Sequence, residues 1–457
     1  MKKLSCAILA LALCVPAYAQ SASDDSKMPI SIDQAIQIAF CQNPEIKAAL
    51  DQLQKSVGGM AEAKSNFMPK LEAEITHLNQ GPGFEFGGFN AIPQYATTGS
   101  LNLFMPLDIS SKLGFVSDIA KYQYQIDYMS LQSASQKLIY NVKQAYYEVL
   151  RAKGQQDVAQ AAVDVANKRL KEARDKFAAG TVADFDVTRS EVEVANLNQT
   201  LIQSKAHVTI ARAGLNRVLG ICVTSQTELV DSDINVEDCK ENVVKCTAQA
   251  YRRRPEIKGA ETAVLLSSKN VKLQKTGNKP SLGIAGEVDH NIPAYGFTTG
   301  HTTWSALLDL KFSVWDGGMT KAKVAQAFAD ENKSKDSLEQ VKLAVSLEVQ
   351  TALTSLTEAT QRVSTAQENV NLAEKSLKLA NDRYDSGITI LVEVADAESA
   401  LTQARFNAVQ AKYDYAVALA ELQRATSTQP EAEGLDCLGE SVKQGKIIYL
   451  GARKQSS

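Results

Sequence analysis

Residues 349–387, VQTALTSLTEATQRVSTAQENVNLAEKSLKLANDRYDSG, repeat an apolar pattern every seven residues. The first position of each heptad holds a larger side chain, namely Val349, Leu356, Val363, Val370, Leu377 and Tyr384. Alanine follows three residues later, at Ala352, Ala359, Ala366, Ala373 and Ala380. This spacing predicts a long helix with a narrow apolar seam, and alanine in the seam lets a neighbouring helix approach closely.

Gly387 follows the last heptad, and glycine is a residue at which helices commonly end. A second ladder starts at Val394 and continues through Ala397, Leu401, Ala404, Ala408, Ala411, Tyr415, Ala418 and Leu422. The two ladders together predict an antiparallel helical hairpin with its tip near residue 387.

The same pattern occurs 207 residues earlier in the chain. The larger positions are Val142, Val149, Gln156, Val163, Leu170 and Phe177, and the alanine positions are Ala145, Ala152, Ala159, Ala166 and Ala173. Gly180 takes the place of Gly387, and a return ladder runs from Val187 to Leu215. A period this long indicates two large structural halves rather than a short-repeat solenoid. The ladders alone leave a generic coiled-coil rod open as the alternative.

The composition excludes one class of partner, and the first residues predict export. The 457 residues carry a net charge of -3 with no block of basic residues, so we expect no nucleic-acid partner. Residues 1–19 have the pattern of a signal peptide: Lys2-Lys3, an apolar segment, and Ala17-Tyr18-Ala19 before the cleavage point. A lipid anchor at Cys14 is the minor alternative. No later apolar run is long enough to predict a transmembrane helix.

The mature chain contains an odd number of cysteines: Cys41, Cys222, Cys239, Cys246 and Cys437. Exported chains can form disulfides. A bridge among Cys222, Cys239 and Cys437, which lie outside the ladders, and free buried thiols are equal alternatives.

Between the helical segments the apolar period changes from helical to two. Helices beginning at Asn43-Pro44-Glu45 and Arg254-Pro255-Glu256 end before Pro69 and Pro280, and strands are expected near 70–80, 97–108, 281–290 and 302–315. About ten residues with one apolar face is the length of a tilted outer-membrane strand, and Trp304 and Trp315 fit an aromatic girdle at the ends of the last strand. Soluble hairpins are the alternative.

Four strands cannot close a barrel, and open edges are not tolerated in lipid, so several chains must share one barrel. We therefore expect an α+β membrane protein, with a shared β-barrel on a long coiled-coil barrel. The first structural repeat covers 20–220 and the second 241–427, with an equatorial linker at 221–240 and an equatorial tail at 428–457. The helix after each strand pair spans about 70 residues, or about 100 Å, and two half-length helices stacked end to end match it.

In this order the motifs resemble the TolC family of outer-membrane export channels. The resemblance rests on the two Pro-Glu helix starts, Pro69 and Pro280, the sequence VWDGG at 314–318, and the tips KFAAG at 176–180 and RYDSG at 383–387. It implies a homotrimer with a twelve-stranded barrel in outer-membrane lipid and a helical tunnel in the periplasm. It also implies a periplasmic adaptor and an inner-membrane pump as partners, in a tripartite efflux pump or a type I secretion system.

The resemblance also implies a gate at the hairpin tips. Glu393 and Asp396 match the family's acidic pair, Asp186 matches the acidic position of the first half, and Tyr384 matches an aromatic residue that holds one hairpin to its neighbour. Thr389 stands where some relatives have arginine. A ring of carboxylates at a constriction concentrates cations. Solvated carboxylates that favour the helix dipole are the alternative.

Two other functions compete with a passive export duct. A periplasmic coiled-coil adaptor or scaffold would have one hairpin, whereas this chain has two. An enzyme is not expected, because the four histidines are scattered and no zinc-protease, phosphate-loop or nucleophile-elbow motif is present. We expect no cofactor and no metal.

Overall fold

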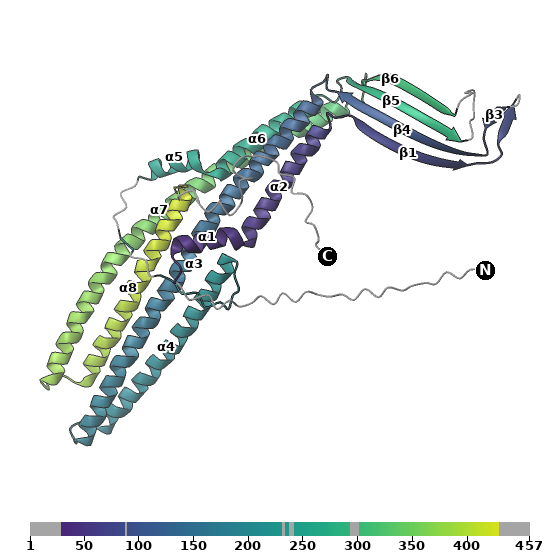
Figure 1. Ribbon diagram of the computed structural model, residues 1–457. Helices are drawn as coiled ribbons and strands as arrows, with labels where there is room; N and C mark the ends of the chain where they lie inside the picture. The colour runs from purple at the N-terminus through teal and green to yellow at the C-terminus, as the bar shows by residue number, and fades with distance from the viewer. Residues whose placement is uncertain (1–28, 87–88, 231–233, 237–241, 293–300, 429–457) are drawn as a thin grey trace, which may run out of the picture.

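The computed structural model describes residues 29–86, 89–230, 234–236, 242–292 and 301–428. The helices and strands in these ranges form a tall helical column with a β-sheet at one end (Figure 1). Each half of the chain passes through a short helix, a medium helix, antiparallel strands, a long helix and a half-length helix. Among the described residues, no helix combines the length and the apolar character needed to cross a membrane.

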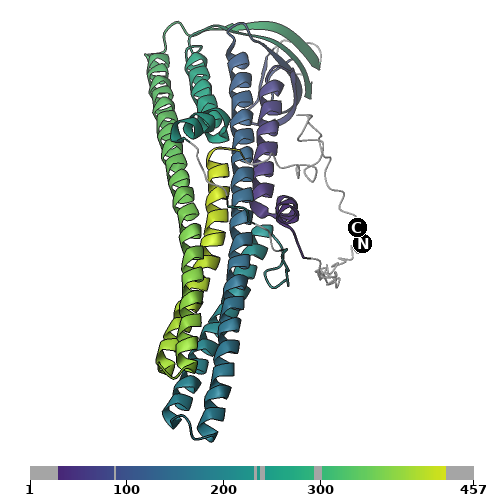
Figure 2. The same ribbon diagram turned by 90° about the vertical axis from the view of Figure 1, so that its left-hand side faces the viewer.

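Two long helices run the full length of the column (Figure 2). They are α3 (Lys112–Ala178) and α7 (Met319–Asp385), each of 67 residues. Helix α7 begins and ends 207 residues after α3, which confirms the duplication of the long helices.

Four shorter helices pack beside the long ones: α2 (Pro44–Ser65), α4 (Asp184–Leu219), α6 (Pro255–Gln274) and α8 (Leu391–Ala425). Helices α2 and α4 pack one after the other along α3, while α6 and α8 pack between α3 and α7. The predicted end-to-end stacking of half-length helices is therefore confirmed. The heptad ladders form the contacts, since Val349, Ala352, Leu356 and Ala359 are buried against α8 and α5 in one apolar cluster.

The two end-to-end junctions use different chemistry at equivalent positions. In the first half Asn43 caps α2 by accepting from the Glu45 N–H (2.7 Å) and donates to the Val218 carbonyl near the end of α4 (2.8 Å). In the second half Arg254 stands in place of Asn43. The Glu348 carboxylate, on α7, accepts hydrogen bonds from both Arg254 and Arg424. One junction is therefore neutral and the other is an arginine–glutamate–arginine cluster.

Two short helices flank the junctions. Helix α1 (Ile32–Gln42) starts with a capping box between Ser31 and Gln34. Helix α5 (Val243–Arg253) starts at Asn242, whose side chain accepts from the Val244 N–H. This helix was not predicted, because its eleven residues are too few to show a heptad ladder.

The main sheet is antiparallel with the order β1-β4-β5-β6. Its strands are β1 (Lys70–Asn79), β4 (Tyr95–Leu107), β5 (Ser281–Ile292) and β6 (Thr302–Lys311). A short hairpin of β2 (Phe84–Phe86) and β3 (Phe89–Ile92), which the strand pattern did not predict, extends the connection between β1 and β4.

The prediction that the last strand reaches residue 315 is wrong. Strand β6 ends at Lys311, which pairs with Ser281, the first residue of β5. Pro280 comes before Ser281 and has no N–H to continue the ladder. Trp315 therefore lies beyond the end of the strand rather than at it.

The structure bears on the two alternatives for the cysteines. Cys222 is a free, exposed thiol, so a bridge among Cys222, Cys239 and Cys437 does not include it. Cys246 is buried on α5. Cys41, at the end of α1, is disulfide-bonded. Cys239 and Cys437 lie outside the described residues. The predicted signal peptide, 1–19, lies outside the described residues too.

Candidate functional site

The two helical hairpins, α3–α4 and α7–α8, turn at the end of the column opposite the sheet (Figure 1). Both turns pass through a glycine with positive φ, 73° at Gly180 and 71° at Gly387. The following residue donates its N–H back to the helix, Thr181 to the Lys176 carbonyl and Ile388 to the Arg383 carbonyl. These are the hydrogen bonds of a glycine C-cap, so both tips form for the same reason.

The structure places the four predicted gate residues around these tips. Glu393 and Asp396 are exposed on the first turns of α8, and Asp186 is half-buried on the first turn of α4. Glu393 lies 3.7 Å from the Arg383 guanidinium across its own turn. Tyr384 is half-buried, and its ring centroid is 4.7 Å from the Lys176 ammonium of the other hairpin. Of the four predicted gate residues, Tyr384 is therefore the one that contacts the other hairpin of the same chain through this ring contact.

The hairpins also meet along a seam between α3 and α8 that the sequence analysis did not find. A Cβ added to Gly154 would lie 2.9 Å from Val409 Cγ1, so glycine is needed for this close approach. Beside it, Asp414 on α8 accepts from Arg151 on α3 (3.4 Å) and from Arg362 on α7 (3.2 Å). A glycine inside a strong helix pattern was the available signal of close packing.

Nearer the tips, Arg169 on α3 and Glu398 on α8 form a two-pronged ion pair. The two N–O distances are 2.6 and 2.5 Å, and the side chains are 18% and 21% exposed. Burial raises the pKa of the Glu398 carboxyl above its ordinary value of 4.5, and this outweighs the opposite effect of Arg169. The carboxylates of Glu193 and Glu172 add to the increase.

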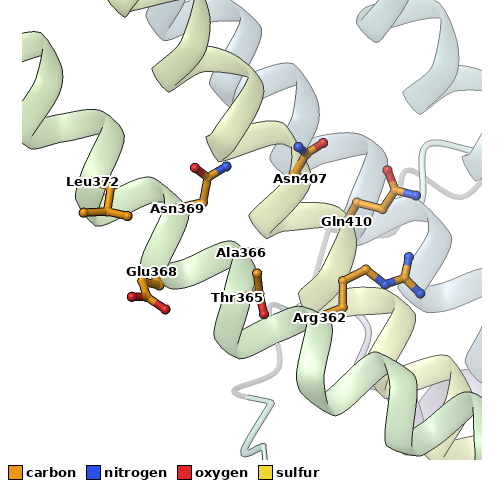
Figure 3. A pocket seen from close by; sticks show the side chains of 8 residues that line it. All are labelled: Arg362, Thr365, Ala366, Glu368, Asn369, Leu372, Asn407 and Gln410. Atoms are coloured by element: carbon orange, nitrogen blue, oxygen red, sulfur yellow. The ribbon is translucent and has the colours of Figure 1, made fainter.

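A shallow groove on the column runs between α7 and α8 (Figure 3). Six of its eight lining residues have polar side chains, and the lining consists of Arg362, Thr365, Ala366, Glu368, Asn369 and Leu372 from α7, with Asn407 and Gln410 from α8. Within the described ranges, histidine, cysteine, aspartate and glutamate do not gather in groups of three that could hold a metal ion.

Comparison with known proteins assigns this architecture to a family. The family model described as outer membrane efflux protein matches residues 35–221 and 247–428. The chain is 23% identical to nodulation protein T of Rhizobium leguminosarum bv. trifolii, over 89% of this chain and 86% of that protein. It is 22% identical to outer membrane protein TolC of Escherichia coli (strain K12), over 88% of this chain and 83% of that protein.

A solved structure shows the same fold. The Campylobacter jejuni CmeC outer membrane channel superposes with a TM-score of 0.78 at 16% identity, covering 90% of this chain and 89% of that chain. Both halves of the chain match this family, which is a family of channels and not a family of enzymes. The chain belongs to the outer membrane efflux protein family and is a TolC-type efflux channel of the outer membrane.

Proposed function

We propose that three copies of the chain form one closed duct, in which a shared barrel of twelve strands crosses the outer membrane above a continuous helical tunnel. The observation that carries this proposal is the four-stranded sheet, because among the described residues β1 and β6 each pair with another strand on one side only. Unpaired backbone groups cost several kcal/mol each in lipid, so the edges must pair with another copy. One face of the sheet exposes large apolar side chains, including Leu71, Ile75, Trp304 and Leu308.

In the part of the chain that the structure describes, the helices also leave a matching pair of edges without a packing partner. Helix α4 has a second heptad stripe on the side away from α3, and all of its members are exposed: Phe185, Thr188, Val192, Ala195, Gln199, Ile202, Ala206 and Thr209. At the opposite edge of the chain α7 exposes Leu343, Leu347, Leu372 and Leu379. Since α3 and α8 lie between these edges, α4 of one copy fits against α7 of the next and a ring closes.

Replacing Ile202 by aspartate tests this contact. We expect the detergent-extracted protein to shift from oligomer to monomer, because a carboxylate would be buried at each interface of the ring. Ile202→Leu keeps an apolar side chain at the same place and should remain oligomeric. Size-exclusion chromatography with light scattering measures both, and an Ile202→Asp protein that stays fully oligomeric would contradict the α4–α7 contact.

At the tips, the threefold ring repeats each predicted gate residue three times. Asp186, Glu393 and Asp396 then supply carboxylates at the narrow end of the tunnel, while Tyr384 holds the hairpins together through Lys176. The duct is passive, and an inner-membrane pump reached through a periplasmic adaptor supplies the energy. A periplasmic scaffold, the competing function, does not account for strands of membrane length with one apolar face.

The double variant Glu393→Gln/Asp396→Asn tests the gate. Wild-type oligomers in a planar bilayer should give a small cation-selective conductance, and the double variant should lose much of this selectivity because the carboxylate ring is gone. Asp336→Asn/Glu339→Gln removes the same charge from exposed positions on α7 far from the tip and should keep the selectivity. Equal selectivity in the wild type and the gate variant would exclude these residues as the selectivity site.

A further inference from the structure

We propose that the Arg169–Glu398 ion pair is a positioning contact that holds the two hairpins of each chain together and so limits the opening at their tips. This inference rests on the proposed channel function and adds a contact outside the gate residues. The pair joins α3 of the first hairpin to α8 of the second through two short hydrogen bonds. A guanidinium paired with a carboxylate in this way has the geometry of the strongest ion pairs.

The position of the pair on the two hairpins supports this role. Arg169 precedes the tip glycine Gly180 by eleven residues, and Glu398 follows the tip glycine Gly387 by eleven residues. Both ends of the pair therefore stand at the same height, about 16 Å above the tips. Closer to the tips, the described residues provide one further contact between the hairpins, in which the Lys176 ammonium lies over the Tyr384 ring.

Other ion pairs in the lower column do not join the hairpins. Arg174 pairs with Glu191 inside the first hairpin, and Arg405 pairs with Glu374 inside the second. Both of these pairs have side chains about half exposed, whereas Arg169 and Glu398 are mostly buried. Exposed pairs contribute little to stability, and a desolvated pair has a larger effect on the spacing of its helices.

Because of the charges around the pair, removing the Arg169 charge and removing the Glu398 charge should have unequal effects. Glu398 lies near Glu172 on α3 and Glu193 on α4, and both carboxylates act on it electrostatically. Loss of the Arg169 charge leaves these carboxylates facing one another across the seam, so the hairpins repel. Loss of the Glu398 charge removes one member of that group instead. Arg169→Gln should therefore separate the hairpins more than Glu398→Gln does.

Distances between spin labels at the tips test the proposal directly. Labels at Ala179 and Ser386, both exposed, report the separation of the two tips of one chain when labelled chains are diluted with unlabelled ones. The Cys222→Ser background removes the exposed thiol. We expect a longer and broader distance distribution in Arg169→Gln, a smaller change in Glu398→Gln, and return to the wild-type distribution in the swap Arg169→Glu/Glu398→Arg. Arg174→Gln, within the first hairpin, is the matched control and should change nothing.

Single-channel conductance of the same variants separates this inference from the channel function. Arg169→Gln should raise the conductance several-fold, and the swap should restore it. If Arg169→Gln does not fold, Arg169→Gln/Glu398→Gln leaves no arginine or glutamate unpaired at these two positions and should still show separated tips. Unchanged tip distances in these variants overturn the proposal. Wild-type oligomers that pass no current while the Arg169→Gln tips still separate would contradict the channel function and leave the ion pair's role standing.

Discussion

Replacing Glu348 by alanine is expected to lower the free energy of unfolding by about 3 kcal/mol, the lower end of the cost of breaking a buried ion pair. Glu348 accepts hydrogen bonds from Arg254 and Arg424 at the junction of α6 and α8. Arg254 is only 3% exposed, so when the Glu348 carboxylate is removed its charge is poorly solvated and keeps only the longer 3.5 Å contact with Glu256. Urea unfolding followed by far-UV circular dichroism measures the loss.

A matched control on the same helix sharpens this prediction. Glu358 forms an exposed pair with Arg362 one turn apart on the same helix, and Glu358→Ala should cost less than about 0.5 kcal/mol. Equal losses for Glu348→Ala and Glu358→Ala would contradict a buried charge cluster at the junction.

The contribution of Glu348 also depends on pH in a defined direction. Burial raises the pKa of its carboxyl, but the hydrogen bonds and charges of Arg254 and Arg424 outweigh burial and hold the pKa below the ordinary value of 4.5. Because the pKa is lower in the folded state, the stabilisation is complete above pH 4.5. It is lost as the pH falls through the pKa of the folded state. The stability difference between wild type and Glu348→Gln should therefore shrink below pH 4.5, and a difference that grows there would contradict this assignment.

Replacing Gly220 by alanine is expected to cost about 3 kcal/mol at the equivalent junction of the first half. Gly220 ends α4 with φ of 76°, where a Cβ costs about 1–2 kcal/mol. The added Cβ would also lie 2.7 Å from the Gln42 carbonyl oxygen and 3.0 Å from Asn43 Cα. Both are backbone atoms at the α1–α2 turn, so this turn must shift to make room, and overpacking of this kind adds about 1–3 kcal/mol.

Gly180 provides the matched control for Gly220. It has nearly the same φ, 73°, but a Cβ added there would meet nothing within 4 Å. Gly180→Ala should therefore show the conformational cost alone, about 1 kcal/mol in urea unfolding. If Gly180→Ala and Gly220→Ala are equally destabilised, the close approach of α4 to the α1–α2 turn does not contribute to stability.

The junctions show what could be predicted from the sequence and what could not. The heptads, the tip glycines and the 207-residue offset are local patterns, and they predicted the long helices, both hairpins and their stacking. The Asn43 and Arg254 positions were recognised as equivalent helix starts. The partner of Arg254 was not predictable, because Glu348 lies on another helix 94 residues away and no local pattern relates the two.

The candidate site also has a part that could be predicted from the sequence and a part that could not. Asp186, Tyr384, Glu393 and Asp396 were assigned through the family resemblance, from their positions relative to the tip glycines. They lie at the helix ends beside the tips, and their gate role stays a prediction. The Arg169–Glu398 pair was missed because the two residues, although each lies next to a heptad position, are 229 residues apart and no local pattern relates them. Only the packing of α8 against α3 brings these two residues together.

The mass of the complex extracted from the outer membrane tests the central claim most directly. Native mass spectrometry of the detergent-released protein should give the mass of three mature chains, because three four-stranded sheets close one barrel and leave no strand edge in lipid. A stable single chain, folded and released from the cell without detergent, would contradict a shared barrel and favour the periplasmic scaffold.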